Sequence, residues 1–226
     1  MSIRTRAADA RPGDCDEITG RGLRHLAGAH ALEFLLLTCP GLDDDGMSQL
    51  PLFPALRMLS VQGAERLGDH GVEPVSRLTT LTNLDLCAHR VSDSGMAEML
   101  ARLPNLEGLT LCIPDVTDAS LRGISALNRL RSLALETPLA STGTLQAAAS
   151  LTSLRSVALY NCTKIATGDL TAFAHVTKLR LQIDDAEPGE VEILRLRMAL
   201  PDCEINGSWY AADAVRKRLA ALTVEQ

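Results

Sequence analysis

A pattern centred on leucine recurs every 24 or 25 residues and limits the possible folds more than any other feature of the chain. Each copy reads Leu-x-x-Leu-x-Leu, with Val in place of Leu at positions 61 and 157. The six copies begin at Leu32, Leu56, Leu81, Leu106, Leu130 and Leu154. Six copies in one register predict a repeat array in which each copy is one layer. The central residue of every copy should then be buried, namely Leu35, Leu59, Leu84, Leu109, Leu133 and Val157.

Each copy also has a second half with a different spacing. Apolar residues there are three apart, as in Leu121, Ile124 and Leu127, which predicts a helix, whereas spacing by two in the first half predicts a strand. Asp and Gly stand between the halves, as in Asp69-His70-Gly71. We expect the Asp to accept the free N–H groups of its own helix and the Gly to permit a tight turn. The predicted fold class is α/β, a solenoid with a parallel sheet on its concave side and helices on its convex side.

The repeat resembles the leucine-rich-repeat family, in the strand–helix subtype with the pattern Leu-x-x-Leu-x-Leu…Asp-x-Gly-Met/Leu. It is most similar to the cysteine-containing and F-box-associated repeats and to arrays in bacterial proteins, over about residues 18 to 206. The resemblance implies a horseshoe fold and protein–protein recognition. One position departs from the family, because only Cys162 matches the Asn or Cys that usually follows the strand. The other copies have Pro40, Ala64, His89, Pro114 and Pro138 there. We expect water or proline to replace the family's side-chain ladder.

The ends of the chain are expected to cap the array, because an open solenoid exposes the apolar faces of its terminal layers. Residues 1–17 are predicted to form a polar tail. Residues 18–206 are predicted to form the repeat domain, an N-terminal helical half-repeat without a strand followed by about seven repeats. Residues 207–226 are predicted to form a capping helix with an amphipathic face that contains Val215, Leu219 and Leu222.

Composition argues against several functional classes. The net charge of −6 disfavours a nucleic-acid binder, which normally has a basic excess. The sequence has no run of 18 apolar residues that could span a membrane. Residues 1–17 lack the apolar stretch of a secretion signal. We therefore expect a cytoplasmic protein, with a secreted effector as the alternative. The 19 arginines against three lysines favour a GC-rich, bacterial source.

The potential catalytic and metal-binding residues do not form a recognisable motif. The six cysteines match no metal-ligand spacing and are too sparse for a disulfide scaffold, so we expect reduced thiols and neither metal nor cofactor. Cys87 and Cys112 share a column in adjacent layers, which leaves a metal pair or a redox switch as the alternative. No histidine pairs with them as a base, and the run Asp43-Asp44-Asp45 lacks the spacing of a calcium loop. The sequence predicts that the protein is not an enzyme and has no small-molecule substrate.

Residues between the buried leucines should form columns on the concave sheet. Phe34, Leu36 and Met58 would gather there as an exposed apolar cluster, which usually marks an interaction site. The alternative is that the N-terminal tail folds over this cluster. Beside the sheet, Arg57, Arg131, Arg155 and, less regularly, Arg180 form a basic column. This column could bind an acidic partner, or it could be a solvated edge of alternating ion pairs.

These observations favour a protein–protein recognition module that binds another protein, and neither nucleic acid nor membrane, through the concave sheet and adjoining loops. The predicted partner-binding residues are Phe34, Leu36, Met58, Ser60, Asp85, Thr110, Arg155 and Tyr160. One alternative is a substrate-selecting or effector subunit of a ubiquitin-ligase-type or host-interaction system. Another is an enzyme that uses the thiol of Cys87 or Cys112.

Overall fold

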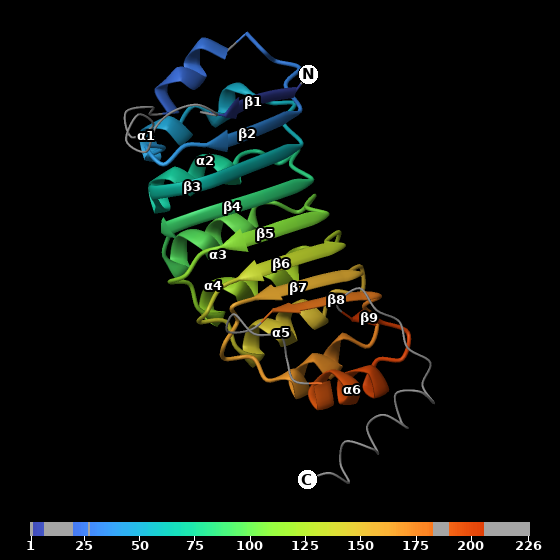
Figure 1. The fold of residues 1–226 in the computed structure, drawn as a ribbon. Helices are drawn as coiled ribbons and strands as arrows, with labels where there is room; N and C mark the ends of the chain where they lie inside the picture. The colour runs from blue at the N-terminus through green and yellow to red at the C-terminus, as the bar shows by residue number, and fades with distance from the viewer. Residues whose placement is uncertain (1, 7–19, 27, 183–189, 206–226) are drawn as a thin grey trace.

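The computed structural model describes residues 2–6, 20–26, 28–182 and 190–205. Within these ranges nine parallel strands stack in sequence order into one sheet, and the helices lie on one side of it (Figure 1). The α/β solenoid predicted from the repeat is confirmed. The sheet does not curl into a ring, so its helix-free side, which we expected to be concave, is called the open face below.

The strands occupy the predicted first halves of the repeats. Their bounds are β1 Ser2–Arg6, β2 Phe34–Thr38, β3 Met58–Gly68, β4 Asn83–Arg90, β5 Gly108–Cys112, β6 Ser132–Glu136, β7 Ser156–Tyr160, β8 Lys178–Gln182 and β9 Glu204–Ile205. Leu35 pairs in register with Leu59, and the same column continues through Leu84, Leu109, Leu133 and Val157. All six of these side chains are at most 2% exposed, which confirms the repeat alignment.

The second halves form short helices, several of them 3₁₀. Their bounds are η1 Gly20–Leu26, α1 Asp44–Met47, η2 Leu50–Leu52, α2 Asp69–Ser76, α3 Asp93–Ala101, α4 Asp118–Leu121, η3 Arg122–Ala126, α5 Thr142–Ala149, η4 Thr167–Phe173 and α6 Glu190–Ala199. Their apolar residues pack on the inner face of the sheet in one continuous aliphatic core. Phe53 and Phe173 are the largest side chains that are fully buried there.

The aspartate at the start of each of the helices α1 to α4 has a role that the sequence did not predict. We expected it to cap its own helix, but the residue before it supplies the cap in three repeats, through Asp43, Ser92 and Thr117. The helix-starting aspartate instead accepts the backbone N–H of the cap residue in the next repeat. These bonds run from Gly68 to Asp44 (2.8 Å), from Ser92 to Asp69 (2.7 Å), from Thr117 to Asp93 (2.7 Å) and from Ser141 to Asp118 (2.8 Å). We call these four residues the aspartate ladder.

The glycine two residues after the helix start makes room for this ladder. A Cβ atom on Gly95 would lie 2.2 Å from Oδ1 of Asp69, and a Cβ on Gly71 would lie 2.5 Å from Oδ1 of Asp44. Both distances are far shorter than any real contact. The Asp-x-Gly pattern therefore links neighbouring layers, since the aspartate of one repeat occupies the space that the glycine of the next leaves empty.

Of the family's side-chain ladder, which we expected to be replaced, one rung is present. Cys162, the one residue that matches the family position, is fully buried, and its thiol lies 3.3 Å from the carbonyl oxygen of Tyr160. A second carbonyl, that of Leu135 in the preceding layer, lies 3.6 Å away. Asn161, just before it, has a left-handed φ of 51°, a conformation that Asn adopts more readily than most residues. In four other repeats the layers are joined at the helix starts by the aspartate ladder.

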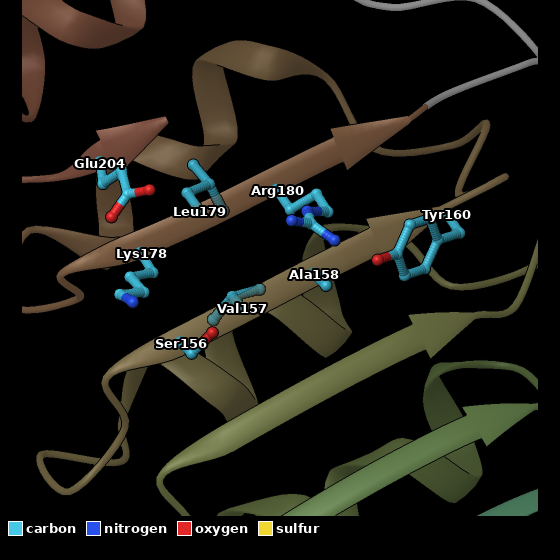
Figure 2. A pocket seen from close by; sticks show the side chains of 8 residues that line it. All are labelled: Ser156, Val157, Ala158, Tyr160, Lys178, Leu179, Arg180 and Glu204. Atoms are coloured by element: carbon cyan, nitrogen blue, oxygen red, sulfur yellow. The ribbon is translucent and has the colours of Figure 1, made fainter. Parts of the chain in front are cut away.

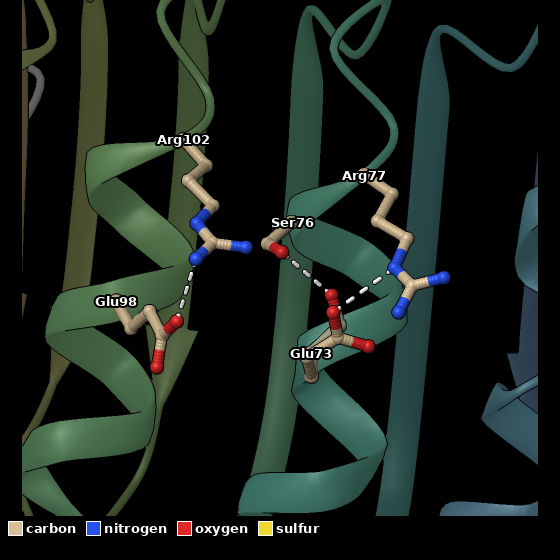
Figure 3. A network of polar contacts seen from close by, with 5 residues as sticks. All are labelled: Glu73, Ser76, Arg77, Glu98 and Arg102. Carbon is tan, nitrogen blue, oxygen red and sulfur yellow. Dashed lines mark hydrogen bonds and ion pairs between the residues drawn. The ribbon is translucent and has the colours of Figure 1, made fainter.

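Ion pairs on the outer surface of the helices contribute little to stability. Glu73 pairs with Arg77 at 2.9 Å in α2, and Glu98 pairs with Arg102 at 2.8 Å in α3 (Figure 3). All four side chains are well exposed, and exposed pairs four residues apart in a helix contribute about 0.3–0.5 kcal/mol each. This helical side is a solvated surface suited to control substitutions.

The N-terminus differs from the predicted polar tail. Residues Ser2–Arg6 form β1, which pairs in parallel with β2 so that Ser2 aligns with Phe34 and Arg4 with Leu36. Ile3 and Thr5 alternate with polar residues in this segment, and both are β-branched, which favours a strand. The first helical half-repeat is thus preceded by a strand after all. The capping helix predicted for residues 207–226 lies outside the described residues.

We predict that Gly95→Ala destabilises the protein although alanine favours helices. The new methyl group would displace the Asp69 carboxylate, which is held by the amide and hydroxyl of Ser92. The free energy of unfolding should fall by roughly 1–3 kcal/mol in urea titrations followed by circular dichroism. In the Asp69→Ala background the same substitution should cost much less. Gly22→Ala, which meets no atom within 4 Å, is the control. Equal losses at both glycines would contradict the steric coupling.

The aspartate ladder also predicts an acid-sensitive fold. Burial acts to raise the pKa of Asp93, but hydrogen bonds from Thr117 and Ser120 outweigh it, and the pKa lies below its ordinary value. The pKa of Asp118 is lowered in the same way by Ser141 and Thr144. A lowered folded-state pKa adds stability that is present above the unfolded value of about 3.9 and is lost as pH falls through the folded value.

The double variant Asp93→Asn/Asp118→Asn should therefore be less stable than wild type at pH 7 and lose less stability on acidification to pH 3. Urea midpoints at the two pH values measure this difference. Asp115→Asn, which removes an exposed carboxylate outside the ladder, should follow wild type. Parallel pH profiles for wild type and the double variant would show that the ladder is not a source of acid sensitivity.

Candidate functional site

The open face carries the three columns of side chains predicted from the repeat. Register pairing aligns Phe34, Met58, Asn83, Gly108, Ser132 and Ser156 in the first column. It aligns Leu36, Ser60, Asp85, Thr110, Ala134 and Ala158 in the second. The third contains Thr38, Gln62, Cys87, Cys112, Glu136 and Tyr160. Gln62 lies one residue beyond Val61, where the regular pairing of β3 with β4 ends. Strand pleating turns the leucines inward and these residues outward.

A hollow of about 360 Å³ lies at the N-terminal end of the open face. Six of the eight predicted partner-binding residues line it, namely Phe34, Leu36, Met58, Ser60, Asp85 and Thr110. Met58 is 42% exposed, which is unusual for a large apolar side chain, while Phe34 and Leu36 are half-buried beside it. We call this the apolar hollow. It combines an exposed hydrophobic wall with polar groups on β3 to β5.

The polar groups of the apolar hollow are held in place by one another. Oδ2 of Asp85 accepts hydrogen bonds from the Ser60 hydroxyl at 3.0 Å and from the Gln62 amide at 2.6 Å. Oδ1 of Asp85 is buried and has no hydrogen-bond partner among the described residues. A buried acceptor without a donor is costly, so a bound molecule that donates to Oδ1 would relieve this cost.

A second hollow, of about 290 Å³, lies at the C-terminal end of the open face between β7, β8 and β9. Tyr160, one of the predicted partner-binding residues, lines it together with Ser156, Lys178, Arg180 and Glu204 (Figure 2). The Tyr160 hydroxyl and the Arg180 guanidinium point toward each other above Ala158 in this view. We call this the basic hollow.

The structure does not place Arg155 with Tyr160 in the basic hollow. Nη1 of Arg155 donates to the carbonyl oxygens of Thr152 at 2.7 Å and Leu154 at 2.8 Å, which ties the guanidinium to its own loop. The prediction that Arg180 belongs to the basic column beside the sheet is wrong, because Arg180 aligns with Ala158 on the open face. Strand β8 follows β7 after 22 residues and not 24 or 25, and this shorter spacing is why the repeat pattern did not predict Lys178 on the open face.

Cys87 and Cys112 are register partners in β4 and β5, and Glu136 follows them in β6. Burial is the main cause that raises the pKa of Cys87, and Asp85 and Glu136 raise it further. Burial, together with Cys87 and Glu136, raises the pKa of Cys112 to about 12. Both thiols are therefore protonated at neutral pH, whereas nucleophilic and metal-binding cysteines are thiolates.

Two further features of the described residues bear on function. No group of three or more His, Cys, Asp or Glu side chains among them is arranged to hold a metal ion. In the same ranges, no helix has the length and apolar character needed to cross a membrane.

No protein-family model matches the chain. A similar solved structure is the Rad7 and Elc1 complex in yeast, with 14% identity, a TM-score of 0.34, and coverage of 83% of this chain and 78% of that chain. Another is an LRR protein of Leptospira interrogans, with 14% identity, a TM-score of 0.46, and coverage of 84% of this chain. This chain spans 45% of that protein's length. At such TM-scores neither likeness carries a functional argument.

The register in which neighbouring strands pair defines the fold of this chain. It is a leucine-rich-repeat solenoid. Its strands carry the repeat leucines in one buried column, and its helices carry the second half of every layer. The resemblance seen in the sequence is confirmed at the level of the fold.

We predict that Cys112 reacts slowly with alkylating agents. A pKa of about 12 lowers its thiolate fraction at pH 8 by at least about 100-fold relative to an ordinary cysteine. Iodoacetamide labelling of the native protein, quantified at this residue by peptide mass spectrometry, should show a matching delay. The same protein unfolded in urea is the control and should react at the ordinary rate. Equal rates in the native and unfolded protein would indicate an activated thiol and reopen the catalytic alternative.

Proposed function

We propose that this protein is a non-catalytic recognition module that binds a partner protein through the open face of its sheet. The observation that carries the proposal is the apolar hollow, in which Phe34, Leu36 and Met58 present a hydrophobic wall to solvent. Exposed apolar surface of this kind, rimmed by polar residues, is typical of protein interaction sites. The sheet beneath it is rigid, because every strand is held by its neighbours.

Binding at the apolar hollow would combine hydrophobic burial with a polar contact. Covering the exposed part of Met58 contributes on the order of 1 kcal/mol. The free Oδ1 acceptor of Asp85 could receive an N–H or O–H group of the partner, and this contact would give the site specificity. Thr110 is exposed on the next strand and adds a hydroxyl to the same rim.

The chemistry of the described residues supports a binding role over catalysis. The raised pKa values of Cys87 and Cys112 leave these thiols protonated, and their column contains no histidine that could act as a base. Both hollows open onto the exposed face of the sheet, whereas sites for small-molecule substrates usually enclose most of the ligand. A large, flat and rigid surface is suited to a protein partner.

The proposal predicts that Met58→Asp abolishes partner binding without unfolding the protein. Peptides selected on the wild-type chain from a random phage library would serve as probes, and fluorescence anisotropy would measure their affinities. A charge at the hydrophobic wall should lower affinity at least about tenfold, since it must be desolvated on binding. Met58 projects from the core, so the unfolding midpoint should change little.

Glu98→Lys on the outer surface of α3 is the matched control, because it changes an exposed side chain far from the open face. Its affinity for the same peptides should stay within about twofold of wild type. Normal binding by Met58→Asp and by Phe34→Asp would refute the open-face assignment and direct attention to the loop edges.

A further inference from the structure

The two ends of the open face differ in charge as well as in shape. Cations gather over the last strands, at Arg131, Arg155, Lys178 and Arg180. The apolar hollow has one charged side chain, that of Asp85, whereas the basic hollow has two cations, Lys178 and Arg180, and one carboxylate, Glu204. In a chain whose net charge is −6, such a local basic cluster is a distinct feature. It gives the basic hollow an attraction for acidic groups.

The cations of the basic hollow are not neutralised within the described residues. The exposed side chains of Lys178 and Arg180 project over β7 and β8, and neither forms an ion pair with a described carboxylate (Figure 2). Glu204, the register partner of Lys178, lines the rim of the same hollow. Tyr160 and Ser156 add hydroxyl groups that can donate to an anion. The hollow therefore has several donors for a carboxylate, and its two cations outnumber its one carboxylate, that of Glu204.

We propose that the basic hollow binds acidic side chains of an extended protein segment whose bulky apolar side chain occupies the apolar hollow. This inference rests on the proposed function and deepens it by specifying the partner's chemistry. The segment crosses the strands along the first two columns. An apolar anchor sits over Met58, and an Asp or Glu side chain lies between Arg180 and Lys178.

The distance between the hollows sets the spacing of the two anchors. Met58 in β3 and Lys178 in β8 are five strand positions apart in the sheet order. Strands lie about 4.8 Å apart, so the separation is roughly 24 Å, which about seven extended residues span. The partner segment should therefore carry its apolar and acidic anchors about seven residues apart.

The surface between the hollows can accommodate such a segment. Small side chains line the adjoining parts of the two hollows and the strand between them, at Gly108, Ser132, Ala134, Ser156 and Ala158. A backbone can approach a floor of this kind closely. The carboxylate of Asp85 at the other end would repel a continuous phosphate backbone, which favours a peptide over a nucleic acid.

The test uses the full 226-residue chain and peptides selected on it from a random twelve-residue phage library. The enriched sequences should place Asp or Glu about seven positions from a bulky apolar residue. Lys178→Glu/Arg180→Glu should lower their affinity about tenfold, because two attractive charges become repulsive. Exchanging the acidic residue of the peptide for Lys should restore binding to this variant, and loss of fold cannot produce such a rescue.

Arg122→Glu/Arg195→Glu is the matched control, because it makes the same change in charge at exposed residues of η3 and α6. It should bind the peptides as wild type does. Peptides whose affinity falls with Met58→Asp but not with Lys178→Glu/Arg180→Glu would overturn this inference and leave the proposed function standing. Peptides without an acidic residue would overturn it as well. A library that yields no binder sensitive to either open-face change would overturn both.

Discussion

The hydrogen bond between a helix-starting aspartate and the cap amide of the next repeat fixes how the layers of this protein stack. Leucine burial provides the driving force, but aliphatic side chains pack in many registers and are not directional. The bond from Ser92 to Asp69 and its equivalents in three other repeats are directional, and Gly95 and Gly71 leave the space they need. Because each of these layers is set against the last, the core leucines keep one register from β2 to β6.

A fixed register turns a one-dimensional sequence pattern into a two-dimensional surface. Every strand residue next to a core leucine joins a column on the open face, so neighbouring side chains there come from residues 22 to 25 positions apart. Through this arrangement Met58 and Phe34 meet in one hollow, and Tyr160 and Arg180 in another. Function can then change through exposed positions while the leucines and the ladder keep the fold.

The sequence was sufficient to predict what the repeat period determines. The buried column, the open-face columns and the apolar hollow with Phe34, Leu36 and Met58 all follow from it. Features that depend on a change of spacing were missed. Strand β8 is displaced by a shorter repeat, which hid Lys178, and β1 is separated from its partner strand by a long segment. The inter-repeat role of Asp69 was missed because a single repeat shows only its own helix start.

A crystal structure of the chain with a selected peptide tests most directly whether the open face is the binding surface. Our account predicts continuous peptide density across the strands from β3 to β8, with an apolar side chain against Met58 and Phe34. The buried acceptor of Asp85 should gain a hydrogen-bond donor from the peptide in that complex. Peptide density on the outer surface of the helices, such as α2 and α3, with an empty open face would contradict the account.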